Sequence, residues 1–318
     1  AKISDGFINF FIKAKLLGAK LYIISHKTIH GHYDKDKVLL RKEALKWINK
    51  KKILDFDNIY FESSIENKIK RINSLKLDYF IDDLFLILNN KNFSSKVKKI
   101  LFNKIENKKF SQNIKQIDEW FKVKDFIFGY ESIKQMKIFA EYMSKKKVKK
   151  IKKIKGQRNS QIYKIVYKNG LTAALKKYPD VTSDNRERMN REYSGLKLIQ
   201  RNGFRYVSKV LYADSNLNII ILKWINGQKP NKISNLDLIE SVNFIKTIHK
   251  ISKKNTKNFP YDAVESCKSL KEITDQIDYK LLKLLKVKNN SRKFRNFLRF
   301  TIMRTYKKLN KNIKTLKL

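Results

Sequence analysis

Helical and strand-like patterns alternate over the first 128 residues, and this alternation restricts the fold more than any other feature of the sequence. Four short apolar runs have the length of buried strands, at 19–25, 58–62, 78–82 and 97–102. Three stretches with helical spacing precede or separate them, at 7–18, 37–50 and 63–75. Because strands that alternate with helices form parallel sheets, we predict an α/β fold with a Rossmann-like parallel sheet for residues 1–128.

The third helical stretch has a recognisable start. Ser63 and Glu66 have the spacing of a capping box, in which a serine and a glutamate satisfy free backbone N–H groups at the helix N-terminus. We therefore predict that Ser63 caps this helix.

The third apolar run ends on two adjacent carboxylates, Asp82 and Asp83. Two neighbouring carboxylates repel each other, and burying either without a partner is costly, so we expect a positive charge beside them. A bound Mg²⁺ ion would supply it. In the alternative, Asp83 is the N-cap of a helix that begins in "LFLIL".

Polar residues at strand ends indicate a phosphate site. Ligands of parallel sheets bind beyond the carboxyl ends of the strands, where Ser25 and Asp82 are expected. Ser25 can donate to a phosphoryl oxygen, and Lys68, or Lys70 if the helix phase requires it, can offset the charge of that oxygen. Asp82 and Asp83 can hold Mg²⁺.

In this order, the residues resemble the second, third and fourth motifs of the haloacid-dehalogenase-like (HAD) phosphohydrolases over about 1–128. The resemblance implies Mg²⁺-dependent phosphatase chemistry with Ser25 and Lys68 on the phosphate and Asp82 and Asp83 on the metal. That family's Asp nucleophile, in a D-x-D motif after its first strand, has no counterpart before Ser25. We expect the nucleophile and that strand to precede Ala1, and this part to be inactive as given.

The pattern changes after residue 128. A helical linker is predicted for 129–149, and strands dominate 150–230, including a hairpin with Asn169-Gly170 as its turn. The remaining residues, 231–318, have mostly helical patterns.

Lys176 lies within the third strand of this second part, where an ammonium group is costly unless an anion meets it. Glu192 follows sixteen residues later on a predicted helix. A strand lysine paired with a helix glutamate is how kinases aim an ammonium group at the phosphates of ATP. In the alternative, Lys176 is an exposed edge-strand lysine.

This stretch resembles the amino lobe of the aminoglycoside phosphotransferase and choline-kinase-like group, with a partial helical carboxy lobe after it. The resemblance implies binding of ATP with Mg²⁺. It assigns Gly156 and Ser160 to a turn that covers the phosphates. Lys176 becomes the lysine that contacts ATP, and Glu192 its partner. Leu222 and Trp224 belong to the hinge that meets adenine. The group's His-Gly-Asp catalytic loop is absent after residue 250, so we expect the sequence to stop before it.

Composition leaves a second class of function open. The net charge of +44 suggests an anionic partner, but lysines occur in every segment instead of in one patch, so specific nucleic-acid binding is not favoured. One cysteine excludes an internal disulfide, and no apolar stretch has the length of a membrane span. A cytoplasmic location is the default expectation.

We therefore hypothesise a fragment of a bifunctional phosphoryl-transfer protein, a HAD-like phosphatase joined to an ATP-dependent small-molecule kinase. Its partner would be a phosphorylated or hydroxylated small molecule. One alternative is a non-enzymatic basic module that binds nucleic acid or another anionic polymer, with steep salt dependence. Another keeps only the phosphatase and treats the remainder as a scaffold.

Overall fold

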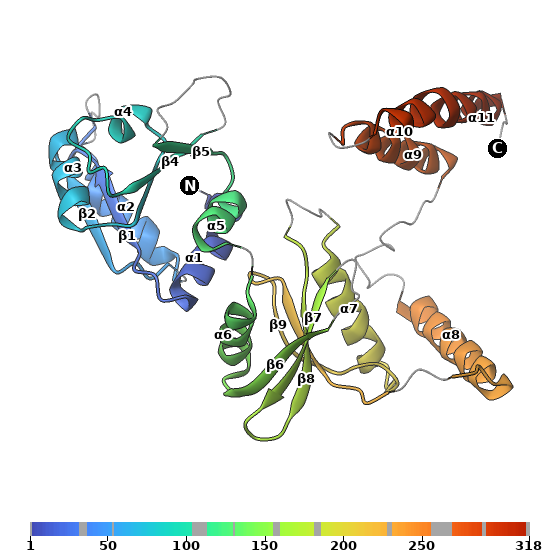
Figure 1. Ribbon diagram of the computed structural model, residues 1–318. Coiled ribbons are helices and arrows are strands. Elements are labelled where there is room, and N and C mark those ends of the chain that lie inside the picture. Colours follow the sequence, from blue (N-terminus) through green and yellow to red (C-terminus); the bar gives the residue numbers. More distant parts are fainter. Residues whose placement is uncertain are drawn as a thin grey trace. The chain divides into compact units, whose positions relative to one another are not determined.

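A computed structural model describes most of the chain and divides it into two compact units, Ala1–Phe259 and Pro260–Leu318. The elements are labelled in Figure 1. The described residues are 2–31, 37–52, 54–103, 113–129, 131–154, 160–180, 186–227, 231–255, 269–287 and 291–315.

The first part of the chain contains parallel strands, as predicted, but in two ladders. Strands β1 (Tyr22–His26) and β2 (Asn58–Glu62) pair with each other. Strands β3 (Tyr79–Asp82), β4 (Lys98–Phe102) and β5 (Ile114–Ile117) form the second ladder. The prediction did not include β5, because its sequence "IKQI" is too short and too polar to be recognised as a strand.

Five helices accompany these strands in the described residues, and four of them, all except α2, bury apolar side chains in two clusters. They are α1 (Phe7–Leu16), α2 (Leu40–Lys50), α3 (Ile65–Ser74), α4 (Phe85–Leu88) and α5 (Trp120–Phe128). One cluster joins Ile69 and Ile72 of α3 to Ile24 of β1 and Phe80 of β3. The other cluster joins residues of α1 and α5 to β4 and β5, and it contains Phe10, Ile100, Ile117 and Val123.

The cap of α3 differs from the prediction by one residue. Ser64 is the N-cap, and its Oγ accepts a hydrogen bond of 3.1 Å from the backbone N–H of Asn67. Ser63 is therefore not the cap, although it has the expected spacing to Glu66. Two consecutive serines make both registers compatible with the sequence, and packing of the helix selects one of them.

The second part of the chain forms one five-stranded antiparallel sheet in the order β6-β7-β8-β10-β9. The strands are β6 (Val148–Ile154), β7 (Gln161–Tyr167), β8 (Thr172–Lys177), β9 (Val210–Asp214) and β10 (Ile219–Lys223). The predicted turn joins β7 to β8, and Gly170 adopts a left-handed φ of 82° there.

Two helices pack against opposite faces of this sheet. The side chains of α6 (Ile133–Ser144) share a core with Tyr163 and Leu175, whereas α7 (Arg188–Arg201) packs on Tyr178 and Ile220. Alternate residues of each strand therefore contact different helices, as expected for a sheet that is covered on both sides.

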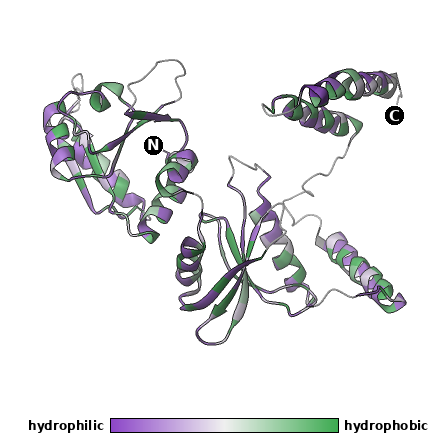
Figure 2. Ribbon diagram, in the orientation of Figure 1, coloured by the Kyte–Doolittle hydropathy of each residue, from purple (hydrophilic) through white to green (hydrophobic). Residues whose placement is uncertain are grey.

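The remaining residues are helical, in agreement with their sequence pattern. The first unit ends with helix α8 (Asn235–Asn255). The second unit contains the helices α9 (Leu270–Leu285), α10 (Arg292–Asn296), η1 (Phe297–Ile302) and α11 (Met303–Thr315). Hydrophobic and hydrophilic residues are interspersed along these helices (Figure 2). Among the described residues, no helix combines the length and the apolar character that crossing a bilayer requires.

Three lysines are buried in a network of charges within the first unit. Lys124 of α5 and Lys177 of β8 both pair with Asp180. Lys177 and Lys13 of α1 also lie 3.5 and 3.9 Å from Glu131. Burial alone would raise the pKa of Asp180, but Lys177 and Lys124 outweigh it and hold that pKa at about 2. For Lys13, burial is the main cause of a lowered pKa.

Candidate functional site

The face of β8 that carries Lys176 is the opposite of the face buried under α6. Ala173 and Leu175 belong to the α6 core, so Ala174 and Lys176 point to the other side. On the neighbouring strands, Ile162 of β7 and Ile220 of β10 lie opposite Lys176 in the pairing register. This places an ammonium group on an otherwise apolar stretch of the sheet.

Lys176 and Glu192 form an ion pair, with 2.5 Å between Lys176 Nζ and Glu192 Oε2. The two side chains are 21% and 32% exposed, so the pair is partly shielded but still reachable from solvent. The Lys176 ammonium also lies 5.1 Å from the centre of the Tyr178 ring. Because β8 lies between β7 and β10, the interpretation of Lys176 as an edge-strand lysine is wrong.

Packing of α7 explains why Glu192 reaches Lys176. Met189 of α7 is buried against Tyr178, Val210 and Ile220, and Tyr193 packs beside it. This contact fixes the helix on the Lys176 face of the sheet. Burial raises the pKa of the Tyr178 hydroxyl, and the negative charge of Glu192 adds to the effect, so this hydroxyl stays protonated.

The residues assigned to an adenine hinge lie on the same sheet. Leu222 is half-buried on β10 and lies opposite Ala174. Trp224 follows β10, and the Lys164 ammonium of β7 lies 4.4 Å from the centre of its ring. Ser160 is half-buried just before β7. Gly156 lies outside the described residues.

The candidate phosphate site at the ends of the parallel strands contains a buried ion pair. Lys68 Nζ of α3 lies 2.6 Å from Asp82 Oδ2 at the end of β3, and the side chains are only 8% and 7% exposed. The backbone N–H of Leu84 donates to Asp82 Oδ1 at 2.9 Å. The positive charge expected beside the carboxylates is therefore an ammonium group from α3.

Asp83 and Ser25 occupy different surroundings. Asp83 is exposed, and it is not the N-cap of α4, because that position is Leu84. Ser25 is half-buried near the end of β1, opposite Phe61 of β2. Lys70, the substitute for Lys68, is exposed.

The carboxylates fit a magnesium site only in part. Mg²⁺ is usually held by one or two carboxylates together with several waters. Both oxygens of Asp82 already accept hydrogen bonds, and the described residues contain no group of three or more His, Cys, Asp or Glu side chains suited to a metal. Lys68 and a metal ion would compete for Asp82.

Two groups of residues near these sites could not be identified from the sequence. Lys164 and Ile220 are recognisable only from the strand register, which places both on the same sheet face as Lys176. The Lys13, Lys124 and Asp180 network depends on contacts between distant elements, for which the sequence holds no local signal.

Comparisons with known proteins add little. No family model matches the chain, and no curated protein matches it either. Among solved structures, a protein of Thermobifida fusca YX-ER1, provisionally described as a fructosamine-3-kinase, is similar over 31% of this chain and 34% of its own. The sequence identity is 16% and the TM-score 0.26, which is too low to support a conclusion about this chain.

Proposed function

We propose that the antiparallel sheet and α7 form the nucleotide-binding part of an ATP-dependent phosphotransferase that acts on a small hydroxylated molecule. The observation that carries the proposal is the ion pair between Lys176 and Glu192. It keeps an ammonium group at a fixed place on an apolar sheet face, where it can meet the phosphates of ATP. An exposed lysine without such a partner would have no fixed position.

The residues of this chain have separate tasks in the proposed complex. Glu192 holds the Lys176 side chain, and Lys176 contacts the phosphates. Leu222 and Trp224 would contact the adenine end, and Ser160, just before β7, would contact the phosphates. ATP, bound with Mg²⁺, would supply the phosphoryl group. The chemistry of transfer requires catalytic residues that this sequence lacks after residue 250.

Replacing Lys176 by methionine tests the proposal, because methionine keeps the length of the side chain and removes its charge. We expect the affinity for a fluorescent ATP analogue to fall about 10- to 100-fold, since a hydrogen bond to a charged group is worth about 1.5–3 kcal/mol. The matched control is Lys153→Met, an exposed residue of β6 that lies opposite Tyr163 and so on the other face of the sheet, which should change the affinity less than about twofold.

Two outcomes would contradict the proposal. One is equal loss of affinity in both variants, which would indicate a non-specific basic surface instead of a site. The other is unchanged affinity in Lys176→Met. A non-specific surface would also bind single-stranded DNA with an affinity that falls steeply between about 50 and 200 mM salt.

We propose a second phosphate site in the first part of the chain, so that the intact protein would be bifunctional and HAD-like there. The buried Lys68–Asp82 pair at the end of β3 supports it. Ser25 would donate to a phosphoryl oxygen and Lys68 would compensate its charge. Asp82 and Asp83 could hold Mg²⁺ only after Lys68 releases Asp82.

Ser25→Ala tests this second site. We expect the affinity for orthophosphate, followed by ³¹P NMR, to fall about 3- to 10-fold, because one hydrogen bond contributes about 0.5–1.5 kcal/mol to the binding free energy. Ser74→Ala, at the exposed end of α3, should have no effect. If Ser25→Ala binds orthophosphate as the unmodified chain does, Ser25 does not contact the phosphate and the proposed site is contradicted.

A further inference from the structure

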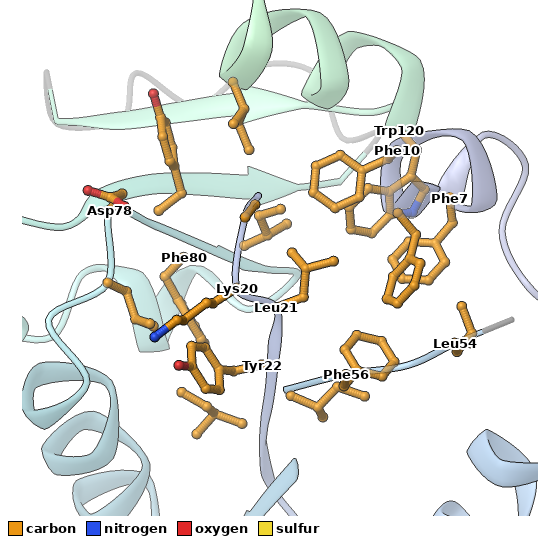
Figure 3. A pocket seen from close by; sticks show the side chains of 18 of the residues that line it. Phe7, Phe10, Lys20, Leu21, Tyr22, Leu54, Phe56, Asp78, Phe80 and Trp120 are labelled. Carbon is orange, nitrogen blue, oxygen red and sulfur yellow. The ribbon is translucent and has the colours of Figure 1, made fainter. Parts of the chain in front are cut away.

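A large cavity lies between the two parallel ladders, lined mostly by apolar residues but also by charged ones such as Lys20, Asp78 and Lys98. Its volume is about 1210 Å³, and its walls include residues of β1 and β3. Figure 3 shows part of the lining, with Leu21, Tyr22 and Phe80 and a group of rings formed by Phe7, Phe10 and Trp120.

The backbone edges of β1 and β3 that face this cavity have no strand partner among the described residues. Leu21 is bonded to Asp57 on the β2 side, through both its N–H and its carbonyl. Since successive residues of a strand direct their backbone groups to opposite edges, the N–H and C=O of Tyr22 and Ile24 point away from β2. β1 pairs with β2 alone in the described part of the chain.

The same reasoning applies to β3. The carbonyl of Asp78 accepts from the N–H of Lys98, so Asp78 and Phe80 direct their backbone groups to β4. Tyr79 and Ile81 then direct theirs to the opposite edge, and both residues line the cavity. Two sheet edges without a strand partner in the described part of the chain thus border the same cavity.

Helices cover this space on both sides. The α3 residues Ile69 and Ile72 share a core with Ile24 of β1 and Phe80 of β3, so α3 spans both ladders. A second apolar cluster, which includes Phe10 of α1 and Trp120 of α5, packs against Leu21, Tyr79 and Ile81. The cavity therefore lies in the sheet layer of a helix–sheet–helix arrangement, a position that a strand normally fills.

We propose that this cavity accepts one extended strand of polypeptide, apolar on both faces, that hydrogen-bonds to β1 and β3 together. A strand rises about 3.3 Å per residue, with about 4.8 Å between strands and about 10 Å between layers, or roughly 160 Å³ per residue. The cavity volume matches about seven to eight residues. All ten strands of the described residues already belong to ladders, so none of these is the donor, and we assign the cavity to a strand of a partner polypeptide.

Amide exchange measured by NMR tests the proposal at single residues. The probe is the peptide acetyl-KVIVFVIK-amide, and the matched control replaces its fourth and sixth residues with proline, which removes two donors and breaks the strand. With the probe, we expect amide exchange to slow at least about tenfold at Tyr22, Ile24, Tyr79 and Ile81. The slowing should increase with the fraction of chains that have bound the peptide. The amides of Ile23 and Phe80, which face other strands, should change little.

Several results would overturn the proposal. Slow exchange at Tyr22 and Ile81 without any peptide would show that the two edges are already bonded, for example in a dimer detected by sedimentation. Protection at one edge alone would indicate simple edge pairing. Equal protection by the proline peptide, or by palmitate, would indicate an apolar pocket that does not recognise backbone. Absence of binding would exclude a strand-accepting cavity.

Discussion

Lys68→Met is expected to lower the free energy of unfolding by about 3–5 kcal/mol, the usual cost of breaking a buried ion pair by removing one partner. Asp82 would remain 7% exposed with its charge uncompensated, because the nearest positive charge comes from Lys68 at 2.6 Å. The measurement is equilibrium unfolding in urea, followed by circular dichroism.

A double variant separates charge from packing. Lys68→Met combined with Asp82→Leu replaces the pair by apolar groups, and we expect it to regain most of the lost stability. If Asp82 and Asp83 can hold magnesium, millimolar Mg²⁺ should stabilise Lys68→Met and leave the double variant unchanged. A loss below about 1 kcal/mol in Lys68→Met would contradict the buried, paired geometry.

Asp180→Asn is expected to have an effect of similar size, about 3–5 kcal/mol at pH 7. Asp180 is 15% exposed and pairs with Lys124 and Lys177, which are 4% and 6% exposed. The asparagine would remove the carboxylate that both buried ammonium groups share, and would leave Lys177 with Glu131 at 3.5 Å and Lys124 with Asp125 at 3.6 Å. Asp55→Asn, whose side chain is 88% exposed, is the matched control and should change stability by less than about 0.5 kcal/mol.

The same residue predicts a pH dependence. The pKa of Asp180 is lowered in the folded state, from 3.8 to about 2, so the folded chain binds its proton less readily than the unfolded chain does. The resulting stabilisation, about 2 kcal/mol, is complete above about pH 5 and is lost as the pH falls through about 4 to about 2. Unfolding at several pH values should show this loss in the unmodified chain and not in Asp180→Asn. An identical acid profile for both chains would contradict the assignment.

Local patterns predicted the elements well where one segment determines its own structure. The hairpin at Asn169-Gly170 and the strand at 58–62 follow from turn chemistry and apolar spacing, and both are present. The approach of Glu192 to Lys176 was also predictable. Glu192 lies on α7, which is the next element after β8 in the chain and packs on the same sheet.

Features that depend on distant contacts were not predictable. The parallel strands were expected in one sheet, but β1 and β3 border a cavity instead of sharing a ladder. A positive charge beside Asp82 was predicted, with Mg²⁺ as a possible source, but the direct pairing of Lys68 with Asp82 was not. In both cases the residues concerned can be read from the sequence. Which of them lie next to each other depends on how α3 packs against the strands.

The central claim is that Lys176, held by Glu192, contacts the phosphates of a nucleotide. A double-mutant cycle of Lys176→Met and Glu192→Gln, with the affinity for a fluorescent ATP analogue as the readout, tests it most directly. We predict that each single variant weakens binding and that the double variant is no weaker than Lys176→Met, because Glu192 acts only through Lys176. Strictly additive losses, or affinities that do not change, would contradict the claim.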